Sequence, residues 1–283
     1  MIAILFCADP LAPRRVDDHF AEQAELVRSL GGTVALIDHD AVQSGRIDDA
    51  VRRVPRDIGR VWYRGWMVSS DAYQNLTTAL ANRGVEPATS ADAYRTAHEF
   101  PGSSATFAEV TPPGEWTAET DDVAGVLGRL ALGPGPAIVK DFVKSRKHEW
   151  DEACFIPSLA DLPAATRVVS RFLELQGDDL AGGLVFRGFE EFTGPQARVW
   201  WVDSEPVLVT AHPDTPDAIV TPELDHIAPC VRSLGCRFIT TDVARRADGV
   251  WRVIEVGDGQ VGDLPAGVDA TVLFQTLLAA LAG

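Results

Sequence analysis

The sequence of 283 residues is short of cysteine and of basic residues, and it has no apolar run long enough to span a bilayer. Its 25 Lys and Arg residues face 41 Asp and Glu residues, which gives a formal net charge of −16. That charge disfavours nucleic acid and anionic membranes as partners, because both need a basic surface. A local basic groove is compatible with this composition and would attract an anionic ligand.

The four cysteines are too few and too scattered for a disulfide framework or a zinc site. Cys7, Cys154, Cys230 and Cys236 form no C-x-x-C pair, and no histidine spacing completes a metal site. Cys7 and Cys154 lie in apolar, strand-like runs, so we expect buried free thiols. The N-terminal MIAILFCADP lacks the basic region and the long apolar run of a signal peptide. These absences predict a cytoplasmic protein.

A glycine-rich nucleotide fingerprint is also missing. Residues 1–100 alternate strand patterns (IAILFCA, TVALIDH, RVWYRGW) with helix patterns over residues 16–30 and 71–83, which is typical of a doubly wound α/β domain. The first turn contains no G-x-G-x-x-G, so a Rossmann dinucleotide site is not predicted. Arg64 follows the third strand, where such sheets bind ligands, and could hold a substrate carboxylate. The alternative is a surface arginine stacked on Trp66.

The rest of the chain predicts mixed α+β structure with a mainly antiparallel sheet. In residues 101–135 the segment TPPGEWTAET indicates a loop, and a helix pattern covers residues 121–132. Further helix patterns cover residues 159–176, 221–234 and 269–282, the last as a core-packing terminal helix. Strand patterns surround the Gly-containing segment 188–195 and flank the turn at residues 204–206.

Residues 237–265 contain two strands, FITTDVAR and VWRVIEV, joined by Asp-Gly at residues 248–249. A two-residue turn would place Val250 opposite Ala247 and Glu255 opposite Asp242. Two facing carboxylates destabilise a strand pair by up to ~1 kcal/mol, and a bound Mg²⁺ reverses that sign. The alternative is an exposed hairpin with two solvated acids.

Positive charge is concentrated around one strand. Lys140 interrupts an otherwise apolar run, so it is either a gatekeeper on an edge strand or a fixed phosphate ligand. Lys144, Arg146 and Lys147 follow within one short loop. That loop is either solvated or a site for an anion.

The chain resembles the ATP-grasp superfamily, because five features occur in that family's order. They are a strand lysine, a basic loop, a hinge, an arginine and an Asp…Glu hairpin. It is most similar to the clade named for two arginines and a lysine. The matching elements cover about residues 136–265. The resemblance implies a pre-ATP-grasp-like α/β domain at residues 1–100, a connecting segment at 101–135, and an ATP-grasp domain with antiparallel sheets at 136–283.

The resemblance also implies roles for the basic residues. Lys140 matches the first phosphate-binding lysine. Residues 144–149 replace the family's mobile glycine-rich loop, so Lys144 or Lys147 would contact phosphate through side chains. Arg198 would lie near the γ-phosphate, and Arg198 and Lys147 are the expected catalytic residues.

Nucleoside and substrate contacts follow from the same resemblance. Arg187 and Phe189 correspond to the hinge whose backbone meets adenine, with Arg187 in place of the usual glutamate. Gln196 replaces the ribose-binding glutamate, and a neutral amide can still bond hydroxyls. Arg64 is the expected contact for a substrate carboxylate.

Three carboxylates are expected at the metal. Asp242 and Glu255 match the family's Mg²⁺ ligands. The asparagine that normally follows two residues after the glutamate is Gly257 here, so Asp258 is the expected substitute ligand. The arginine often found two residues before the aspartate is Thr240.

The resemblance implies an ATP-dependent carboxylate–amine ligase that forms an acyl phosphate on a small acid, amino acid or peptide, with ATP and Mg²⁺ as cofactors. It allows a homodimer, and no nucleic-acid or membrane partner is expected. A small-molecule phosphotransferase is one alternative. A non-catalytic nucleotide-binding protein is another, favoured by the departures at Arg187, Gln196, Thr240 and Gly257.

Overall fold

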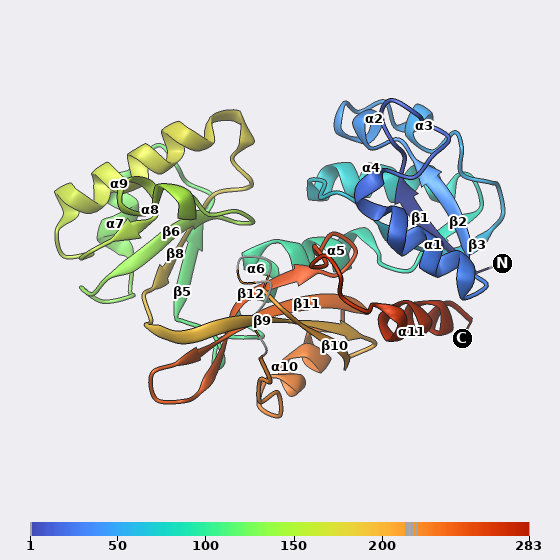
Figure 1. Ribbon diagram of the computed structural model, residues 1–283. Helices are drawn as coiled ribbons and strands as arrows, with labels where there is room; N and C mark the ends of the chain where they lie inside the picture. The colour runs from blue at the N-terminus through green and yellow to red at the C-terminus, as the bar shows by residue number, and fades with distance from the viewer. Residues whose placement is uncertain (1, 213–214, 216–217, 219, 283) are drawn as a thin grey trace. The chain divides into compact units, whose positions relative to one another are not determined.

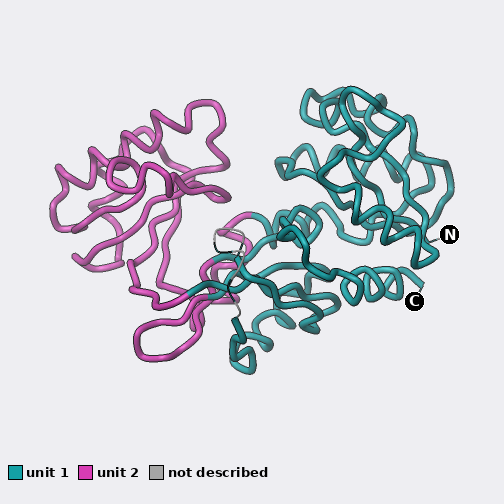
Figure 2. Tube along the Cα trace, in the orientation of Figure 1, with its two compact units in different colours: residues 1–98, 195–243, 255–283 teal, residues 99–194, 244–254 magenta. Residues whose placement is uncertain are grey.

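The computed structural model describes residues 2–212, 215, 218 and 220–282 (Figure 1). It divides into two compact units: unit 1 comprises residues 1–98, 195–243 and 255–283, and unit 2 comprises residues 99–194 and 244–254 (Figure 2). Each unit is assembled from separate stretches of chain. The consecutive domains expected from the sequence, residues 1–100, 101–135 and 136–283, are a different kind of division and stay a prediction.

Unit 1 contains a parallel sheet of order β2-β1-β3-β4. Its strands are β1 (Ala3–Cys7), β2 (Thr33–Ile37), β3 (Gly59–Arg64) and β4 (Val85–Pro87). β1 pairs in parallel with β2 and β3, and all of its residues are buried, which explains its continuously apolar sequence. The predicted α/β fold of this region is confirmed, and Cys7 is a buried free thiol as expected.

The helices of unit 1 come from several stretches of the chain. They are η1 (Asp18–Phe20), α1 (Ala21–Ser29), α2 (His39–Gln43), α3 (Ile47–Ala50), α4 (Ser70–Ala81), α5 (Ala91–His98), α10 (Ala228–Leu234) and α11 (Thr271–Ala282). The helix predicted over residues 16–30 begins later, because Asp17 caps a 3₁₀ turn by accepting from His19 N–H. The helix predicted over residues 221–234 begins only at Ala228, with Pro229 in its first turn. The predicted terminal helix is confirmed as α11, which buries Leu273 and Phe274.

Unit 2 contains an antiparallel sheet of order β5-β8-β6-β7. Its strands are β5 (Gly114–Thr117), β6 (Ala137–Asp141), β7 (Phe155–Ile156) and β8 (Leu184–Gly188). β5 lies inside TPPGEWTAET, so the predicted loop is wrong there. The Pro-Pro-Gly signal is local, whereas β5 is an edge strand formed by pairing with distant β8.

The helices of unit 2 are α6 (Phe100–Ser103), α7 (Val123–Arg129), η2 (Lys147–Glu149), α8 (Trp150–Ala153), α9 (Leu162–Gln176) and η3 (Gly177–Asp179). α9 packs against α7, α8 and β6, as can be followed in Figure 1. Asp161 caps α9 by accepting from Ala164 N–H, and Val169 and Phe172 lie on its buried face. Among the described residues, no helix combines the length and the apolar character needed to cross a membrane.

A third sheet has the order β10-β9-β11-β12. Its strands are β9 (Phe192–Val202), β10 (Glu205–Ala211), β11 (Phe238–Arg246) and β12 (Trp251–Asp258), and the unit boundaries fall within β9, β11 and β12. In unit 1, Trp200 of β9 and Phe238 of β11 belong to the same core as β1 and β3. Residues 195–202 and 238–243 are thereby fixed against buried aromatic side chains.

The turn between β11 and β12 differs from the predicted two-residue type. Gly249 N–H donates to Arg246 O at 2.8 Å, Arg246 N–H donates to Val250 O at 2.9 Å, and Gly249 has a φ of 92°. These bonds define a three-residue loop with glycine in the left-handed position. Val250 therefore pairs with Arg246, and the predicted pairing with Ala247 is wrong.

The predicted register does hold at the other end of the hairpin. Gly259 N–H donates to Phe238 O at 3.0 Å, and Thr240 Oγ1 lies 3.2 Å from the place that a Cβ on Gly257 would take. Between these two ends the β12 side therefore contains one residue more than the β11 side. Whether the two predicted metal-binding acids face one another directly stays a prediction.

Candidate functional site

The residues predicted to form the site fall into both units. Unit 2 contains Lys140, Lys144, Lys147, Arg187 and Phe189. Unit 1 contains Arg64, Gln196, Arg198, Asp242, Glu255 and Asp258. Each set has its own local geometry and is described by itself.

Arg198 on β9 and Asp242 on β11 form a forked ion pair in unit 1. Arg198 Nε donates to Asp242 Oδ1 at 2.7 Å, and Nη2 donates to Oδ2 at 2.8 Å. His212 Nε2 lies 3.3 Å from the same Oδ2. Arg198 Nη1 donates to Asp263 O at 3.2 Å. Two parallel bonds fix the plane of the guanidinium, so its position is set before any ligand arrives.

The ion pair favours the charged forms of both Arg198 and Asp242. Burial alone would raise the pKa of Asp242, but hydrogen bonds from Arg198 and His212 and their positive charge lower it to about 2. Burial would lower the pKa of Arg198, but its hydrogen bonds to Asp242 and the negative charges of Asp242, Glu255 and Asp263 raise that pKa instead. Arg198 is thus within electrostatic reach of Glu255, and both members of the pair are charged at neutral pH.

His212 was missed in the sequence analysis. β10 pairs with β9 so that Thr210 stands opposite Arg198, and His212 follows two residues later on the same face. Its backbone N–H donates to Gln196 O at 3.2 Å. The strand pattern VLVTAH contains this histidine as its last residue. Only the register between β9 and β10 shows that the histidine reaches Asp242.

The donor set suits a magnesium ion that is shared with a nucleotide. Within the described part of the chain, no group of three or more His, Cys, Asp or Glu side chains is arranged to hold a metal. Mg²⁺ at phosphate sites commonly takes one or two protein carboxylates and completes its shell with phosphate and water. Asp242 and Glu255 fit that limited role, and Asp242 would then exchange some of its contact with Arg198 for the ion.

Asp258 lies in a separate, enclosed cluster. Its Oδ1 accepts from the N–H and Nε2 of Gln260 at 2.9 and 3.0 Å, and its Oδ2 has no hydrogen-bond partner among the described residues. Burial raises the pKa of Asp258 to about 7. These surroundings favour a neutral acid, which binds Mg²⁺ poorly, and the metal role expected for Asp258 stays a prediction.

Gln260, a second residue missed from sequence, joins this cluster to β3. Its Oε1 accepts from Tyr63 N–H at 3.0 Å, and its backbone O accepts from Arg64 Nη1 at 3.0 Å and from Gly65 N–H at 3.2 Å. The side chain is fully buried, so these bonds replace water completely. They fix the loop that follows the Asp…Glu hairpin.

Arg64 is enclosed in the same place. It is 1% exposed, its Nε donates to Gln23 Oε1 at 2.8 Å, and its guanidinium lies 5.5 Å from the ring centre of Phe20. Burial lowers the pKa of Arg64 to about 10. The alternative of a surface arginine stacked on Trp66 is wrong. A contact between Arg64 and a substrate carboxylate would require this cluster to open.

Lys140 lies in an internal strand of unit 2, because β6 runs between β8 and β7. The edge-strand interpretation is therefore wrong. Its Nζ donates to Val143 O at 3.0 Å, and the side chain is 9% exposed. The ammonium is held at the start of the basic loop, where the resemblance requires a phosphate ligand.

Asp141, which the sequence analysis did not single out, anchors that loop. Its Oδ1 accepts from Val143 N–H at 2.7 Å and from Lys144 N–H, and its Oδ2 accepts from Gln176 Nε2 at 2.6 Å and from Ala181 N–H at 3.2 Å. The carboxylate is fully buried. Four N–H donors thus compensate its charge and fix where the basic loop leaves β6.

The basic loop presents only part of its charge to solvent. Lys144 and Lys147 are exposed, whereas Arg146 Nε donates to Gln176 Oε1 at 2.6 Å and its Nη2 donates to Leu175 O. Arg146 thereby ties the loop to the end of α9. Lys144 and Lys147 are the more exposed basic side chains of this loop.

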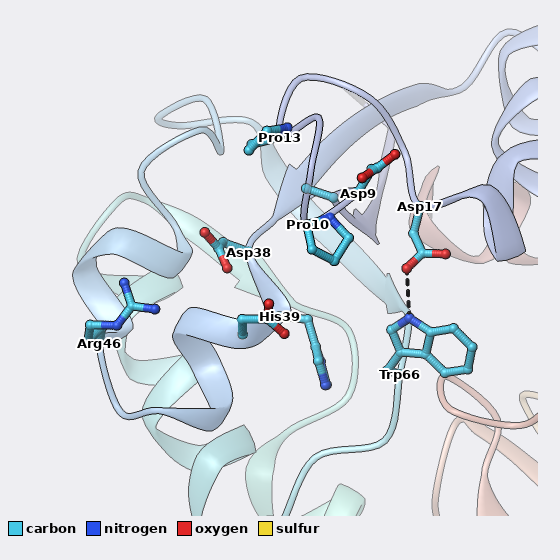
Figure 3. A pocket seen from close by; sticks show the side chains of 10 residues that line it. Asp9, Pro10, Pro13, Asp17, Asp38, His39, Arg46 and Trp66 are labelled. Carbon is cyan, nitrogen blue, oxygen red and sulfur yellow. Dashed lines mark hydrogen bonds between the residues drawn. The ribbon is translucent and has the colours of Figure 1, made fainter.

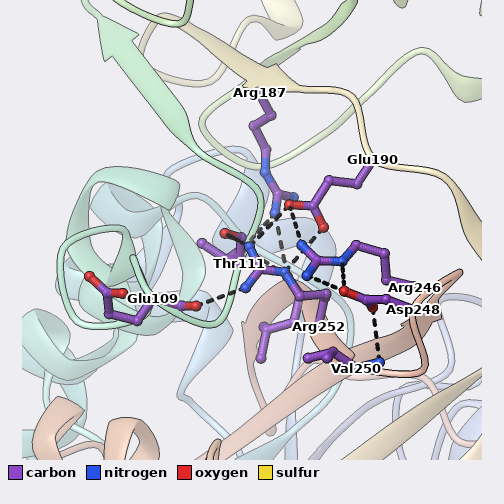
Figure 4. A network of polar contacts seen from close by, with 9 residues as sticks. Glu109, Thr111, Arg187, Glu190, Arg246, Asp248, Val250 and Arg252 are labelled. Carbon is purple, nitrogen blue, oxygen red and sulfur yellow. Dashed lines mark hydrogen bonds and ion pairs between the residues drawn. The ribbon is translucent and has the colours of Figure 1, made fainter.

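Arg187 takes part in an arginine-rich network rather than pointing to solvent (Figure 4). Its guanidinium donates to Thr111 Oγ1 at 2.5 Å and to Ile254 O, and it is 5% exposed. Arg252 forms a fork with Glu190, at 3.1 and 3.0 Å. Arg187 therefore fixes the residue directly before Glu255, a contact that the sequence did not predict.

Phe189 follows β8 and is 37% exposed. Its ring centre lies 5.1 Å from that of Phe155 and 6.2 Å from that of Trp150, so three aromatic rings form one cluster. Its N–H donates to Pro136 O at 2.9 Å. An adenine contact from this N–H would have to replace that bond.

A family model matches residues 129–277, which is more than half of the chain. It describes an ATP-grasp domain, family 3 of the clade named for two arginines and a lysine. No curated protein matched the chain in the sequence comparison.

Solved structures share the whole fold at low identity. The D-cycloserine synthetase DcsG has a TM-score of 0.68 at 14% identity over 98% of each chain. A RimK domain ATP-grasp protein from Sphaerobacter thermophilus has a TM-score of 0.63 at 13% identity, over 99% of this chain and 100% of that one. The ATP-grasp ligase PsnB, complexed with precursor peptide PsnA2 and AMPPNP, has a TM-score of 0.58 at 17% identity, over 99% of this chain and 97% of that one. These similarities establish the ATP-grasp ligase fold.

Proposed function

The chain belongs to the ATP-grasp domains, in family 3 of the clade of two arginines and a lysine, and on that premise we propose that it is an ATP-dependent carboxylate–amine ligase. The carboxylate would first take the γ-phosphoryl group of ATP, giving an acyl phosphate and ADP. An amine would then displace phosphate and form the amide. The observation that carries the proposal is the forked ion pair of Arg198 with Asp242, which lies in the matched region together with Glu255.

Phosphoryl transfer needs charge neutralisation and positioning more than covalent help from the protein. In this proposal Arg198, Lys140 and the exposed lysines Lys144 and Lys147 stabilise the phosphate charges. Asp242 and Glu255 hold Mg²⁺, which would supply further charge neutralisation when bound. Gln196 would bond the ribose, and Arg187 and Phe189 would stand at the adenine.

The substrate classes follow from the same reasoning. A small acid, an amino acid or a peptide could supply the carboxylate, and the likeness to PsnB with its precursor peptide supports the peptide class. Arg64 keeps its proposed role toward a carboxylate only if the Gln260 cluster opens. A cytoplasmic location is part of the proposal, since all four cysteines are free thiols.

Binding of the nucleotide is tested by thermal melting with and without Mg²⁺-ATP, on wild type and on Glu255→Gln. A ligand that binds only the native state at a hundredfold excess over its Kd stabilises it by about 2.7 kcal/mol. We expect a Mg²⁺-dependent shift that the variant loses. A wild-type chain that no nucleotide stabilises would contradict the proposal and favour a scaffold without catalysis.

Product analysis separates ligase from phosphotransferase. A ligase releases ADP and inorganic phosphate with a condensed product, whereas a phosphotransferase leaves the phosphoryl group on its product. We expect ³¹P NMR to show free phosphate in step with ADP. A stable phosphorylated product without free phosphate would favour the phosphotransferase.

A further inference from the structure

Unit 1 contains a cavity of about 240 Å³ that none of the roles above uses (Figure 3). It lies at the carboxyl ends of three neighbouring parallel strands: Asp9 follows β1, Asp38 follows β2 and Trp66 follows β3. Ligands of open α/β sheets bind outside these strand ends, where successive connections leave in opposite directions. β1 lies between β2 and β3, so the cavity is at that position.

Negative charge dominates the wall of this cavity. Asp9, Asp17, Asp38 and Asp40 line it. The lining includes one arginine, Arg46, and its ion pair at 3.6 Å is with Asp49, outside the cavity. No ion pair involves any of the four lining carboxylates in the part of the chain that the structure describes. Four carboxylates and one arginine leave the lining with an excess of negative charge, which a cationic ligand would offset.

His39 provides an independent sign of a missing partner. Its Nδ1 is buried and has no hydrogen-bond partner among the described residues. Burial lowers the pKa of His39, although Asp40, Asp17 and Asp38 act to raise it. His39 is one of the residues that line the cavity, and a buried polar atom left unpaired is unfavourable.

Trp66 forms an aromatic wall with a fixed orientation. Its Nε1 donates to Asp17 Oδ2 at 3.0 Å, and its ring centre lies 5.1 Å from that of Phe20 in an edge-to-face arrangement. The side chain is 39% exposed, so part of the ring remains open. An indole face next to carboxylates suits an ammonium or guanidinium group through cation–π attraction.

We propose that this cavity binds the protonated amine or guanidinium end of a substrate, held by the carboxylates, Trp66 and His39. The affinity for a cation stands on the cavity alone. That the cation belongs to the ligase substrate rests on the proposed function. A substrate bound here carries its positive group away from the reacting carboxylate, as a diamino acid or a peptide with a basic residue does.

The test is calorimetric titration of the full chain, without nucleotide, with three probes of equal length: putrescine, 1,4-butanediol and succinate. We expect putrescine to bind, butanediol and succinate not to bind, and the putrescine affinity to fall with added salt. Equal affinities for putrescine and butanediol would overturn the proposal. A titration with putrescine that shows no heat of binding would overturn it as well.

Matched variants place the binding in the cavity. Asp40→Asn removes a lining charge, and Asp38→Asn removes another while an asparagine can still cap α2 at Ala41 N–H. Each should weaken putrescine about threefold, and the double variant about tenfold. Asp48→Asn, an exposed acid of α3 outside the cavity, is the control and should change nothing. An equal loss with Asp48→Asn would show attraction by the net negative charge only, which overturns the site.

Failure of this inference is distinguishable from failure of the proposed function. Stabilisation by Mg²⁺-ATP without putrescine binding removes the cation site and leaves the ligase. Putrescine binding without any nucleotide effect removes the ligase and leaves the site.

Discussion

At the scale of single residues, the Arg198–Asp242 fork is central to the proposed site. The carboxylate is nearly buried, and its charge is compensated by the guanidinium and by His212. A ligand that brings both phosphate and Mg²⁺ offers each member of the pair a new partner of opposite charge. The fork therefore favours the ionised state of both groups, which is the state that the proposed reaction needs.

Asp242→Asn should lower the free energy of unfolding by about 3 kcal/mol, because it leaves a mostly buried arginine without its anion. Urea unfolding of the full chain measures this. Asp203→Asn is the control, since it breaks a fork of the same geometry with Arg237 at an exposed site and should cost below about 1 kcal/mol. Equal losses in the two variants would contradict the importance given to burial.

Asp258 should make stability depend on pH with an unusual sign. The unfolded group ionises near pH 4 and the native group at about 7, so between these values the native state holds the proton more tightly. Its contribution is therefore full below pH 4, falls as the pH rises to 7, and then levels off, with a slope of at most about 1.4 kcal/mol per pH unit.

Asp258→Asn removes this titration and keeps an oxygen that can accept from Gln260. As the pH rises from 4 to 7, the unfolding free energy of wild type should fall relative to that of the variant. A difference that stays constant over this range would show that Asp258 is ionised in the native state, as a metal ligand would be.

At the scale of elements, the β11–β12 turn depends on glycine. Gly249 has a φ of 92°, which a side chain tolerates poorly, although the space around it is open apart from Arg245 at 3.4 Å. Gly249→Ala should cost about 1 kcal/mol in unfolding free energy. Gly128→Ala in α7, where no atom lies within 4 Å of the new Cβ, should be neutral or stabilising. A Gly249→Ala protein as stable as wild type would contradict the assigned turn.

The conformation of the basic loop should depend on Asp141. Asp141→Ala leaves four N–H donors without their acceptor and should lower the unfolding free energy by roughly 3 kcal/mol. Asp141→Asn retains one acceptor oxygen and should lose less. Hydrogen exchange at residues 143–147 reports the loop directly, and unchanged exchange in Asp141→Ala would contradict the anchoring role.

Sequence patterns predicted the elements that are locally determined and missed those that depend on distant pairing. The apolar β1 and the helices α4 and α9 follow from runs and periodicity. β5 was missed because it exists only as an edge partner of β8. The turn register was wrong by one residue, because Asp-Gly fits both two-residue and three-residue loops.

The candidate site shows the same division. Asp242, Arg198 and Lys140 were proposed as site residues through the order of family motifs, and their roles stay predictions. His212, Asp141 and Gln260 were missed because ordinary polar residues acquire their roles only from the register of strands or from burial. Arg64 was expected to contact a substrate carboxylate or to lie at the surface, and its enclosure cannot be read from one strand.

At the scale of the whole molecule, an excess of negative charge surrounds a few fixed cations. Lys140 and Arg198 are held by protein contacts, and in the proposed reaction a polyanionic nucleotide would approach them against the net charge of −16. Mg²⁺ reduces the charge of the incoming nucleotide, which is a further reason for ATP to bind as its magnesium complex.

The most direct measurement is trapping of the acyl phosphate. The full chain is incubated with Mg²⁺-ATP, hydroxylamine and pools of amino acids and short peptides that include basic members, and hydroxamates are detected by mass spectrometry. The proposed reaction predicts a hydroxamate that requires ATP and is lost in Glu255→Gln. ADP release with a stable phosphorylated product and no hydroxamate from any acid would contradict the ligase mechanism.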